Sequence, residues 1–167
     1  MKTRFELPYR IAIIEPKKLI GFSITTSFQD DKTQIVWKKF MMRRNEIVNQ
    51  TSNQLFSLQI YPENFTANQT FRKYALAEVP DFNNIPNDFE TFELESGKYL
   101  VFNYQGKAEH GPEIFRYIFQ NVIPEYQFEV DNRPYFEIFQ DDYNPNSDSA
   151  EEEIWIPIKQ ITISSIF

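Results

Sequence analysis

The 167-residue sequence predicts an α+β fold in a single domain, residues 1–167, in which the element order β-β-α-β-β occurs twice. The two halves cover residues of about 10–80 and 89–160. Runs rich in Ile, Val, Phe, Tyr and Thr indicate strands, and two stretches with apolar residues at helical spacing indicate helices. The Pro- and Asn-rich segment 81–88 is typical of a linker between them. A period of about 80 residues exceeds that of solenoids and favours an internal duplication.

Four runs in the first half indicate strands. They are RIAIIEP (10–16), KKLIGFSITTSF (17–28), LFSLQIYP (55–62) and FRKYALAEVP (71–80). We expect a helix over about 31–49, because Asp31 can cap its first turn and Gln34 stands three residues later, as in a capping box. The residues that recur at helical spacing are Trp37, Phe40, Met41, Arg44 and Val48.

The second half repeats this order. Residues 89–106 indicate two strands around a turn at Ser96-Gly97, and PYFEIFQ (134–140) and EIWIPIK (153–159) indicate the last two. Between them, Gly111-Pro112 opens a helix with Pro in its first turn, and Pro124 is expected to end it. The apolar stripe of this helix consists of Ile114, Phe115, Ile118, Phe119 and Val122.

Composition and charge exclude several classes of function. The net charge is -7 and no long run of Lys or Arg occurs, so no direct nucleic-acid partner is expected. The chain has no Cys, and hence neither disulfides nor thiol chemistry. No apolar stretch approaches the ~20 residues of a membrane span, and the N-terminus lacks the apolar run of a signal peptide. We therefore expect a cytoplasmic protein without a membrane partner.

The sequence gives little support for a metal or a cofactor. His110 is the only His, which makes a His-based metal cluster or catalytic triad a weak candidate. Oxygen-bearing side chains from Asp142 to Glu153 have the spacing of an EF-hand loop, but Ser147 stands where that loop requires Gly. We expect a solvated hairpin tip here, and neither a metal nor a cofactor in the protein.

Glu137 lies in the middle of PYFEIFQ, whose other residues suit a buried strand. Because side chains alternate across a strand, Tyr135, Glu137 and Phe139 share one face. Phe136 and Ile138 share the other face, which we expect to pack beneath the helices. The corresponding residues of the last strand are Glu153 and Trp155 on one face, and Ile154, Ile156 and Ile158 on the helix-covered face.

The face with Glu137 is thus predicted to be aromatic and acidic rather than simply polar. The chain has 17 Phe, 9 Tyr and 2 Trp, enough to line a cavity for an apolar ligand. Aromatic faces attract cations, and a carboxylate in an apolar setting favours a positive partner. This face therefore predicts a concave site for an apolar, cationic compound. The alternative is that Glu137 is exposed, or paired with a Lys or Arg across the strand.

The C-terminal half resembles the GyrI-like small-molecule-binding domains. The resemblance rests on KYLVFNYQG (98–106), a helix that opens at 111, RPYFEIF (133–139) and EIWIPIK (153–159), while the first half is similar only in element order. This family includes effector domains of AraC-type and MerR-type regulators and stand-alone relatives of the gyrase inhibitory protein. The resemblance implies two pseudo-symmetric β-α-β-β units, antiparallel sheets with helices on one face, and a ligand cleft between the units.

The resemblance also implies which residues meet the ligand. Glu137 corresponds to the family's pocket carboxylate, which contacts lipophilic, often cationic compounds, and relatives line the cleft with aromatic residues of the helix that holds Trp37. The residues expected at the cleft are Glu137, Tyr135, Phe139, Trp155, Trp37, Tyr104 and Tyr74. No DNA-binding helix-turn-helix is recognised in the sequence.

Three functions are consistent with these observations. The first is a stand-alone module that binds an apolar, cationic small molecule. The second is a hydrolase of reactive electrophilic compounds, with Glu137 as the general base for water; some stand-alone relatives have this activity. The third is a protein-interaction module that binds a basic surface on a protein partner, as a gyrase inhibitor would, through its negative charge.

Overall fold

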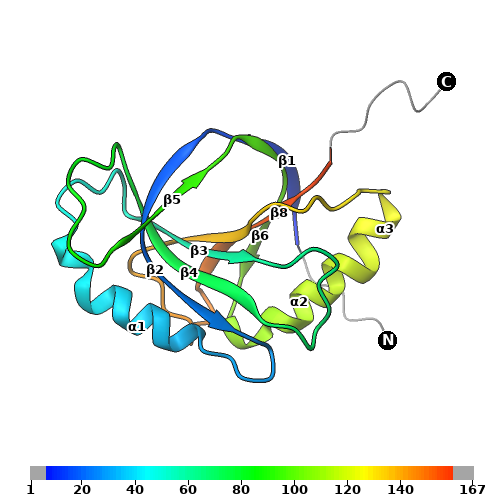
Figure 1. The fold of residues 1–167 in the computed structure, drawn as a ribbon. Coiled ribbons are helices and arrows are strands. Elements are labelled where there is room, and N and C mark those ends of the chain that lie inside the picture. Colours follow the sequence, from blue (N-terminus) through cyan, green and yellow to red (C-terminus); the bar gives the residue numbers. More distant parts are fainter. Residues whose placement is uncertain (1–6, 160–167) are drawn as a thin grey trace.

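The computed structural model describes residues 7–159, which form one eight-stranded sheet whose paired strands are all antiparallel (Figure 1). The strands are β1 (Tyr9–Ile14), β2 (Lys17–Thr26), β3 (Gln54–Ile60), β4 (Phe71–Val79), β5 (Glu90–Leu94), β6 (Gly97–Gln105), β7 (Tyr135–Gln140) and β8 (Glu151–Pro157). Every extended run expected from the sequence forms a strand. The predicted α+β class with antiparallel pairing is confirmed.

The strand order β1-β6-β8-β7-β3-β4-β2-β5 is symmetric about the central β3–β7 pair. Each half gives its first strand to the other half, because β1 pairs with β6 and β5 pairs with β2. The two halves are therefore joined by three sets of backbone hydrogen bonds, of which the central set links β3 to β7. They form one continuous sheet rather than a separate sheet each.

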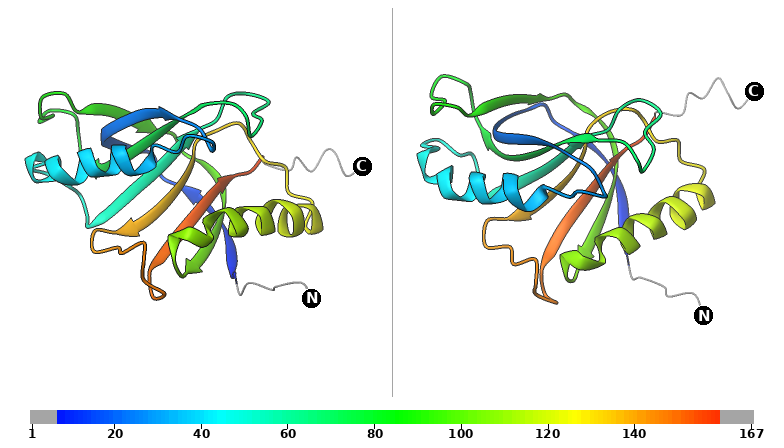
Figure 2. Two further views of the ribbon diagram at one scale, coloured as in Figure 1. Left: turned by 90° about the horizontal axis from the view of Figure 1, so that it is seen from below. Right: turned by 60° about the horizontal axis from the view of Figure 1, so that its bottom comes forward.

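Two helical segments lie on the same side of this sheet (Figure 2). The first is α1 (Thr33–Arg43), followed by the 3₁₀ turn Arg44–Glu46. The second begins with the 3₁₀ turn Ala108–His110 and continues through α2 (Gly111–Tyr117), the π-helical turn Ile118–Val122 and α3 (Ile123–Glu125). Within residues 7–159, none of these helices has the length and apolar character needed to cross a membrane.

The first helix differs at its ends from what the sequence predicts. Lys32, not Asp31, is the N-cap of α1, although Asp31 Oδ1 accepts a hydrogen bond from the Thr33 N–H at 3.0 Å. The helix ends at Arg43, and Val48, beyond it, is 78% exposed. The second segment ends at Glu125, one residue after Pro124, close to where the sequence predicts its end.

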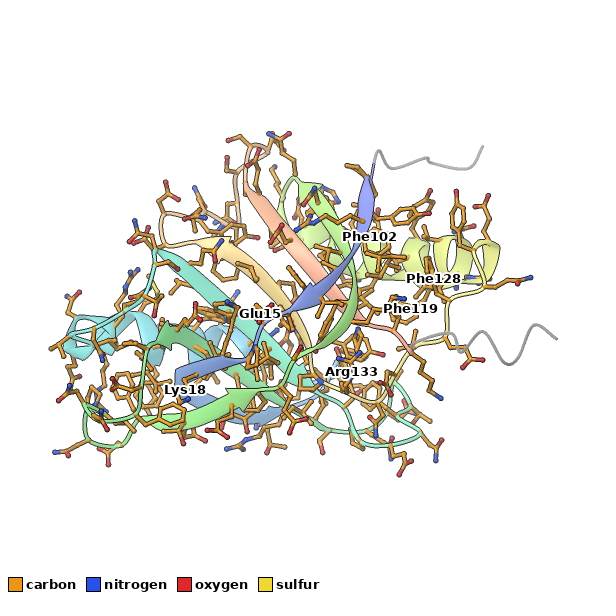
Figure 3. All side chains as sticks on the ribbon, turned by 90° about the horizontal axis from the view of Figure 1, so that it is seen from above. Glu15, Lys18, Phe102, Phe119, Phe128 and Arg133 are labelled. Carbon is orange, nitrogen blue, oxygen red and sulfur yellow. The ribbon has the colours of Figure 1, made fainter. Side chains whose placement is uncertain are left out.

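Two apolar clusters fill the space between the helices and the sheet. Beneath α1, Val36 and Phe40 pack against strand residues such as Phe22. Beneath α2, Ile114 packs in the cluster that contains Phe102, with Phe128 against its outer side (Figure 3). These two clusters fix each helix to its own half of the sheet, and they leave a space between the helices.

A third apolar cluster lies on the opposite face of the sheet, away from the helices. It contains Phe136, Ile138 and Trp155, together with Ile14 of β1 and Leu94 of β5 from the two edges of the sheet. The prediction that Phe136 and Ile138 pack beneath the helices is therefore wrong. The sheet curls until its edges meet on this side, so that both of its faces bury apolar side chains.

Candidate functional site

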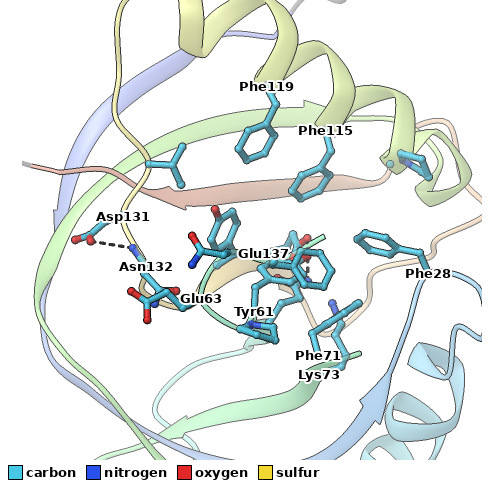
Figure 4. Close-up of a pocket in the computed structure, with 18 of the residues that line it drawn as sticks. Phe28, Tyr61, Glu63, Phe71, Lys73, Phe115, Phe119, Asp131, Asn132 and Glu137 are labelled. Atoms are coloured by element: carbon cyan, nitrogen blue, oxygen red, sulfur yellow. Dashed lines mark hydrogen bonds between the residues drawn. The ribbon is translucent and has the colours of Figure 1, made fainter. Parts of the chain in front are cut away.

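A cavity of about 1190 Å³ lies on the helix-bearing side of the sheet, between the start of α1 and the length of α2 (Figure 4). Its floor is formed by β3, β4 and β7. A cavity of this volume is large enough to enclose most of a drug-sized molecule. It occupies the space that the two helix-bound apolar clusters leave open.

A row of polar side chains crosses the floor of the cavity. Lys73, Gln59 and Tyr135 are direct register partners across β4, β3 and β7, so their side chains lie side by side on one face. Glu137 lies two residues further along β7 and points to the same side. Gln59 Nε2 donates a hydrogen bond to Glu137 Oε2 at 2.9 Å and a longer one to Oε1 at 3.3 Å. The carboxylate thus sits in the middle of the sheet with a neutral donor beside it.

Aromatic rings form the walls of the cavity. Phe115 of α2 and Phe119 of the following π-helical turn project into the space, and Phe119 stacks on Tyr135 with ring centroids 6.4 Å apart (Figure 4). On the opposite wall Tyr61 meets Tyr135 edge to face at 5.0 Å. The remaining rings at the cavity are Phe28, Phe65 and Phe71. Together these rings present a broad π surface around the Glu137 carboxylate.

Lys73 brings a second ionisable group to the floor of the cavity. Its side chain is only 6% exposed, and burial lowers the pKa of its amine, an effect that the negative charges of Glu137, Glu152 and Asp31 partly offset. The amine makes no hydrogen bond or ion pair with another residue of the described chain. Lys73 and Glu137 therefore interact electrostatically across the cavity floor without forming a direct ion pair.

Glu152 lies on β8, on the same face of the sheet as Ile154, the register partner of Glu137, and outside the cavity lining. Burial raises the pKa of its carboxyl to about 7, and the charge of Glu137 adds to the effect. The Tyr143 hydroxyl donates a hydrogen bond to Glu152 Oε2 at 3.3 Å. Burial also raises the pKa of Tyr61, with a further contribution from Glu137, and raises that of Tyr135 to about 12. Both phenols are therefore neutral donors at physiological pH.

Of the residues that the sequence predicts at the cleft, Glu137 and Tyr135 line the cavity. Trp155 does not, because it is the register partner of Phe136 and so lies on the opposite face of the sheet. Tyr74 also points to that opposite face, since it alternates with Lys73, and its ring packs 5.2 Å from that of Phe92. The prediction of one face shared by Glu137 and Trp155 is wrong.

Three other predicted residues lie on the helix side but outside the cavity. Phe139 is covered by Trp37, at 5.1 Å between ring centroids, and by Tyr143, at 4.5 Å. Trp37 itself packs over Phe139 and joins the cluster beneath α1. Tyr104 belongs to the cluster beneath α2, and its hydroxyl donates to the Lys107 carbonyl at 2.8 Å. These three rings are part of the packing around the site and do not face the cavity.

Most of the cavity wall was not expected from the sequence. Helical spacing places Phe115 and Phe119 in the apolar stripe of the second helix, and Phe65 lies between two expected strands in a segment that is otherwise mostly polar. A signal was nevertheless present, because Tyr61 and Phe65 are large aromatic residues within an otherwise polar connection. In the structure the two rings pack against each other, with centroids 4.7 Å apart, and both line the cavity.

The fold and the cavity define a small-molecule-binding module of the GyrI-like class, as the resemblance implied. More particularly, the chain belongs to the Cass2 family of integron-associated effector binding proteins, whose model matches residues 10–158. That match covers nearly all of the described chain, both halves included. No curated protein sequence matches the chain significantly.

Solved structures share this fold. SAV2435 bound to tetraphenylphosphonium is 20% identical with a TM-score of 0.67, over 91% of this chain and 94% of that one. An integron cassette protein of Vibrio cholerae, VCH_CASS2, is 18% identical with a TM-score of 0.65, over 93% and 100%. The C-terminal domain of EcmrR is 10% identical with a TM-score of 0.71, over 94% and 100%. At these identities the likeness concerns the fold.

Proposed function

We propose that this protein binds apolar aromatic cations in the cavity, with Glu137 as the counter-charge. The observation that carries the proposal is the setting of that carboxylate. It stands among aromatic rings, it accepts hydrogen bonds only from the neutral amide of Gln59, and no Lys or Arg of the described chain forms an ion pair with it. A half-buried carboxylate that no cationic side chain pairs with directly favours a cation from outside, and the rings attract that cation.

The relatives support this ligand class. SAV2435, which shares the fold over nearly its whole length, is bound to tetraphenylphosphonium, a cation surrounded by four phenyl groups. The cavity of this protein offers a negative charge that complements the positive charge of such an ion, and aromatic surfaces that complement its phenyl groups. Tetraphenylphosphonium is therefore the appropriate first probe.

The test compares two ions of the same shape and opposite charge. We expect tetraphenylphosphonium to bind saturably in isothermal titration calorimetry, and tetraphenylborate to bind far more weakly. Glu137→Gln should weaken binding of the cation by about 10- to 100-fold, the equivalent of the about 1.5–3 kcal/mol of an interaction with a charged group. The matched control is Glu95→Gln, an exposed carboxylate with the same change of net charge.

Either of two results would overturn the proposal. Equal affinity for the cation and the anion would show that charge is not recognised. Equal affinity of the Glu137→Gln and Glu95→Gln variants would show that Glu137 is not the counter-charge.

A second candidate function is hydrolysis of an electrophilic compound such as an epoxide. The observation that favours it is the juxtaposition of the Glu137 carboxylate, a base for water, with the protonated phenols of Tyr61 and Tyr135, which can donate to a leaving oxygen. Turnover of styrene oxide that is lost in Glu137→Gln would support this function. Absence of turnover across a panel of epoxides and cyclopropanes, or turnover that survives the substitution, would exclude it.

A further inference from the structure

The Lys73 amine lies at the floor of the cavity without a direct hydrogen bond or ion pair to another described residue. The side chain lines the cavity and is 6% exposed. Figure 4 shows the Lys73 side chain reaching from β4 into the same space as Glu137. The amine thus reaches the cavity space with its hydrogen-bonding capacity unused by the described chain, so a ligand in the cavity can meet it directly.

The burial of Lys73 raises the neutral, nucleophilic fraction of its amine above that of an exposed lysine, because it lowers the pKa. Burial lowers the pKa of the amine, and the carboxylates that act against this effect are Glu137 on β7, Glu152 on β8 and Asp31 before α1. The phenols of the cavity are neutral donors and add no charge. A lysine desolvated in an apolar pocket is the usual form of the amine that attacks carbonyl compounds.

We propose that Lys73 captures apolar aromatic aldehydes as an imine. The Nζ lone pair attacks the aldehyde carbon, a C–N bond forms, and the carbonyl oxygen takes up a proton to give a carbinolamine. The nitrogen then loses a proton, the C–O bond breaks, and the oxygen leaves as water with a second proton. The product is a C=N bond, and no oxidant or reductant takes part.

The cavity suits this product. A protonated imine of an aromatic aldehyde is itself a flat, apolar cation, attached to the floor beside Glu137. The carboxylate of Glu137 balances its charge, and the rings of Phe115 and Phe119 cover its aromatic part (Figure 4). The protons that the two steps require are exchanged with water that reaches the cavity.

This inference goes beyond the proposed function, because covalent capture does not require affinity for free cations. It extends the accepted ligands from cations to neutral carbonyl compounds that become cations once bound. The two proposals can be tested independently of each other. Binding of tetraphenylphosphonium without imine formation would remove only the present inference, and imine formation without cation binding would remove only the proposed function.

The test traps the imine in the full chain. The protein is incubated with 2-naphthaldehyde at pH 7.5, reduced with sodium cyanoborohydride, and mapped by peptide mass spectrometry. An exposed lysine has about one amine in a thousand unprotonated at this pH. We therefore expect Lys73 to carry at least about ten times more adduct than the exposed Lys38. Since the mapping uses the unchanged protein, the result does not depend on a variant that must fold.

Variants then examine the setting of the amine. Lys73→Met should abolish the single adduct, with circular dichroism to verify its fold, whereas Lys38→Met should leave the yield unchanged. Glu137→Gln should lower the yield about 3- to 10-fold, because the cationic product loses its opposite charge. An excess of tetraphenylphosphonium should block labelling of Lys73 alone. Labelling spread over the exposed lysines, or an unlabelled Lys73, would overturn the inference.

Discussion

The Gln59 amide on β3 donates to both carboxylate oxygens of Glu137 on β7, at 2.9 Å and 3.3 Å, across the pair of strands that joins the two halves of the sheet. This contact holds the carboxylate in place without neutralising it. The negative charge at the cavity floor therefore stays available to a ligand, and the strand pairing at the centre of the sheet fixes its position.

Replacement of Gln59 by Leu should destabilise the protein in the absence of ligand. The substitution leaves a partly buried carboxylate without its donor, and we expect the free energy of unfolding to fall by about 1–3 kcal/mol. Saturating tetraphenylphosphonium should restore part of that loss, because it binds only the folded chain. Urea denaturation with and without the cation measures both effects. The control is Gln34→Leu on the exposed side of α1, and a Gln59→Leu variant as stable as this control would contradict the prediction.

Glu152 should make the protein less stable as the pH rises from about 5 to 7. Its pKa in the folded state is raised from 4.5 to about 7, so in this window the folded chain holds a proton that the unfolded chain has released. The stabilisation is complete below the unfolded pKa and is lost as the pH passes the folded pKa. Because solvent screens this half-buried side chain in part, we expect the free energy of unfolding to fall by about 1–2 kcal/mol over this pH range.

The variant that tests this pH dependence is Glu152→Gln, which cannot titrate. Its free energy of unfolding should lack the decline between about pH 5 and 7, whereas Glu151→Gln, an exposed neighbour, should retain it. Thermal or urea unfolding at several pH values measures the difference. Identical slopes in the two variants would show that Glu152 does not carry the effect.

Binding of a cation should release protons near pH 7. A positive ligand beside Glu137 disfavours the protonated carboxyl of Glu152, whose pKa is about 7, so this carboxyl releases protons when the cation binds. The affinity for tetraphenylphosphonium should therefore rise from pH 6 to pH 8. Titrations in phosphate and in Tris, which differ in ionisation enthalpy, measure the protons released. Net proton uptake, or an affinity that falls as the pH rises, would refute this linkage.

Two aromatic substitutions should separate the cavity wall from the opposite face of the sheet. Phe119→Ala removes a ring at the cavity that is 36% exposed, and we expect about 3- to 10-fold weaker binding of tetraphenylphosphonium with little loss of stability, the equivalent of about 0.5–1.5 kcal/mol. Trp155→Phe should leave the dissociation constant within about twofold, although it changes the third apolar cluster. Equal weakening by both substitutions, measured by calorimetry, would contradict the placement of the site.

The order of elements could be predicted from the sequence because it depends on local patterns. Alternation within PYFEIFQ correctly places Tyr135 and Glu137 on one face. The prediction that Trp155 shares this face was wrong because it depends on the register between β7 and β8. The loop between the two strands determines that register, and a shift of one residue moves every side chain of a strand to the other face. The alternation of side chains along a strand also does not tell which face the helices cover. In a sheet this strongly curled, both faces bury apolar side chains, so hydrophobicity does not distinguish them.

The cavity wall was harder to predict for a different reason. The rings of Phe115, Phe119 and Phe65 come from a helix and a connection that lie far apart in the sequence, and each looks like ordinary packing by itself. Lys73 and Gln59 become neighbours of Glu137 only through the pairing of β4, β3 and β7. Such contacts depend on the topology as a whole.

The reciprocal exchange of β1 and β5 has a mechanical consequence. Since each half supplies an edge strand to the other, and β3 and β7 are paired between them, the halves cannot swing about a hinge as two separate lobes. The backbone framework around the cavity is therefore fixed by strand pairing, and the parts of its wall outside the sheet come from the connection between β3 and β4 and from the helical segments.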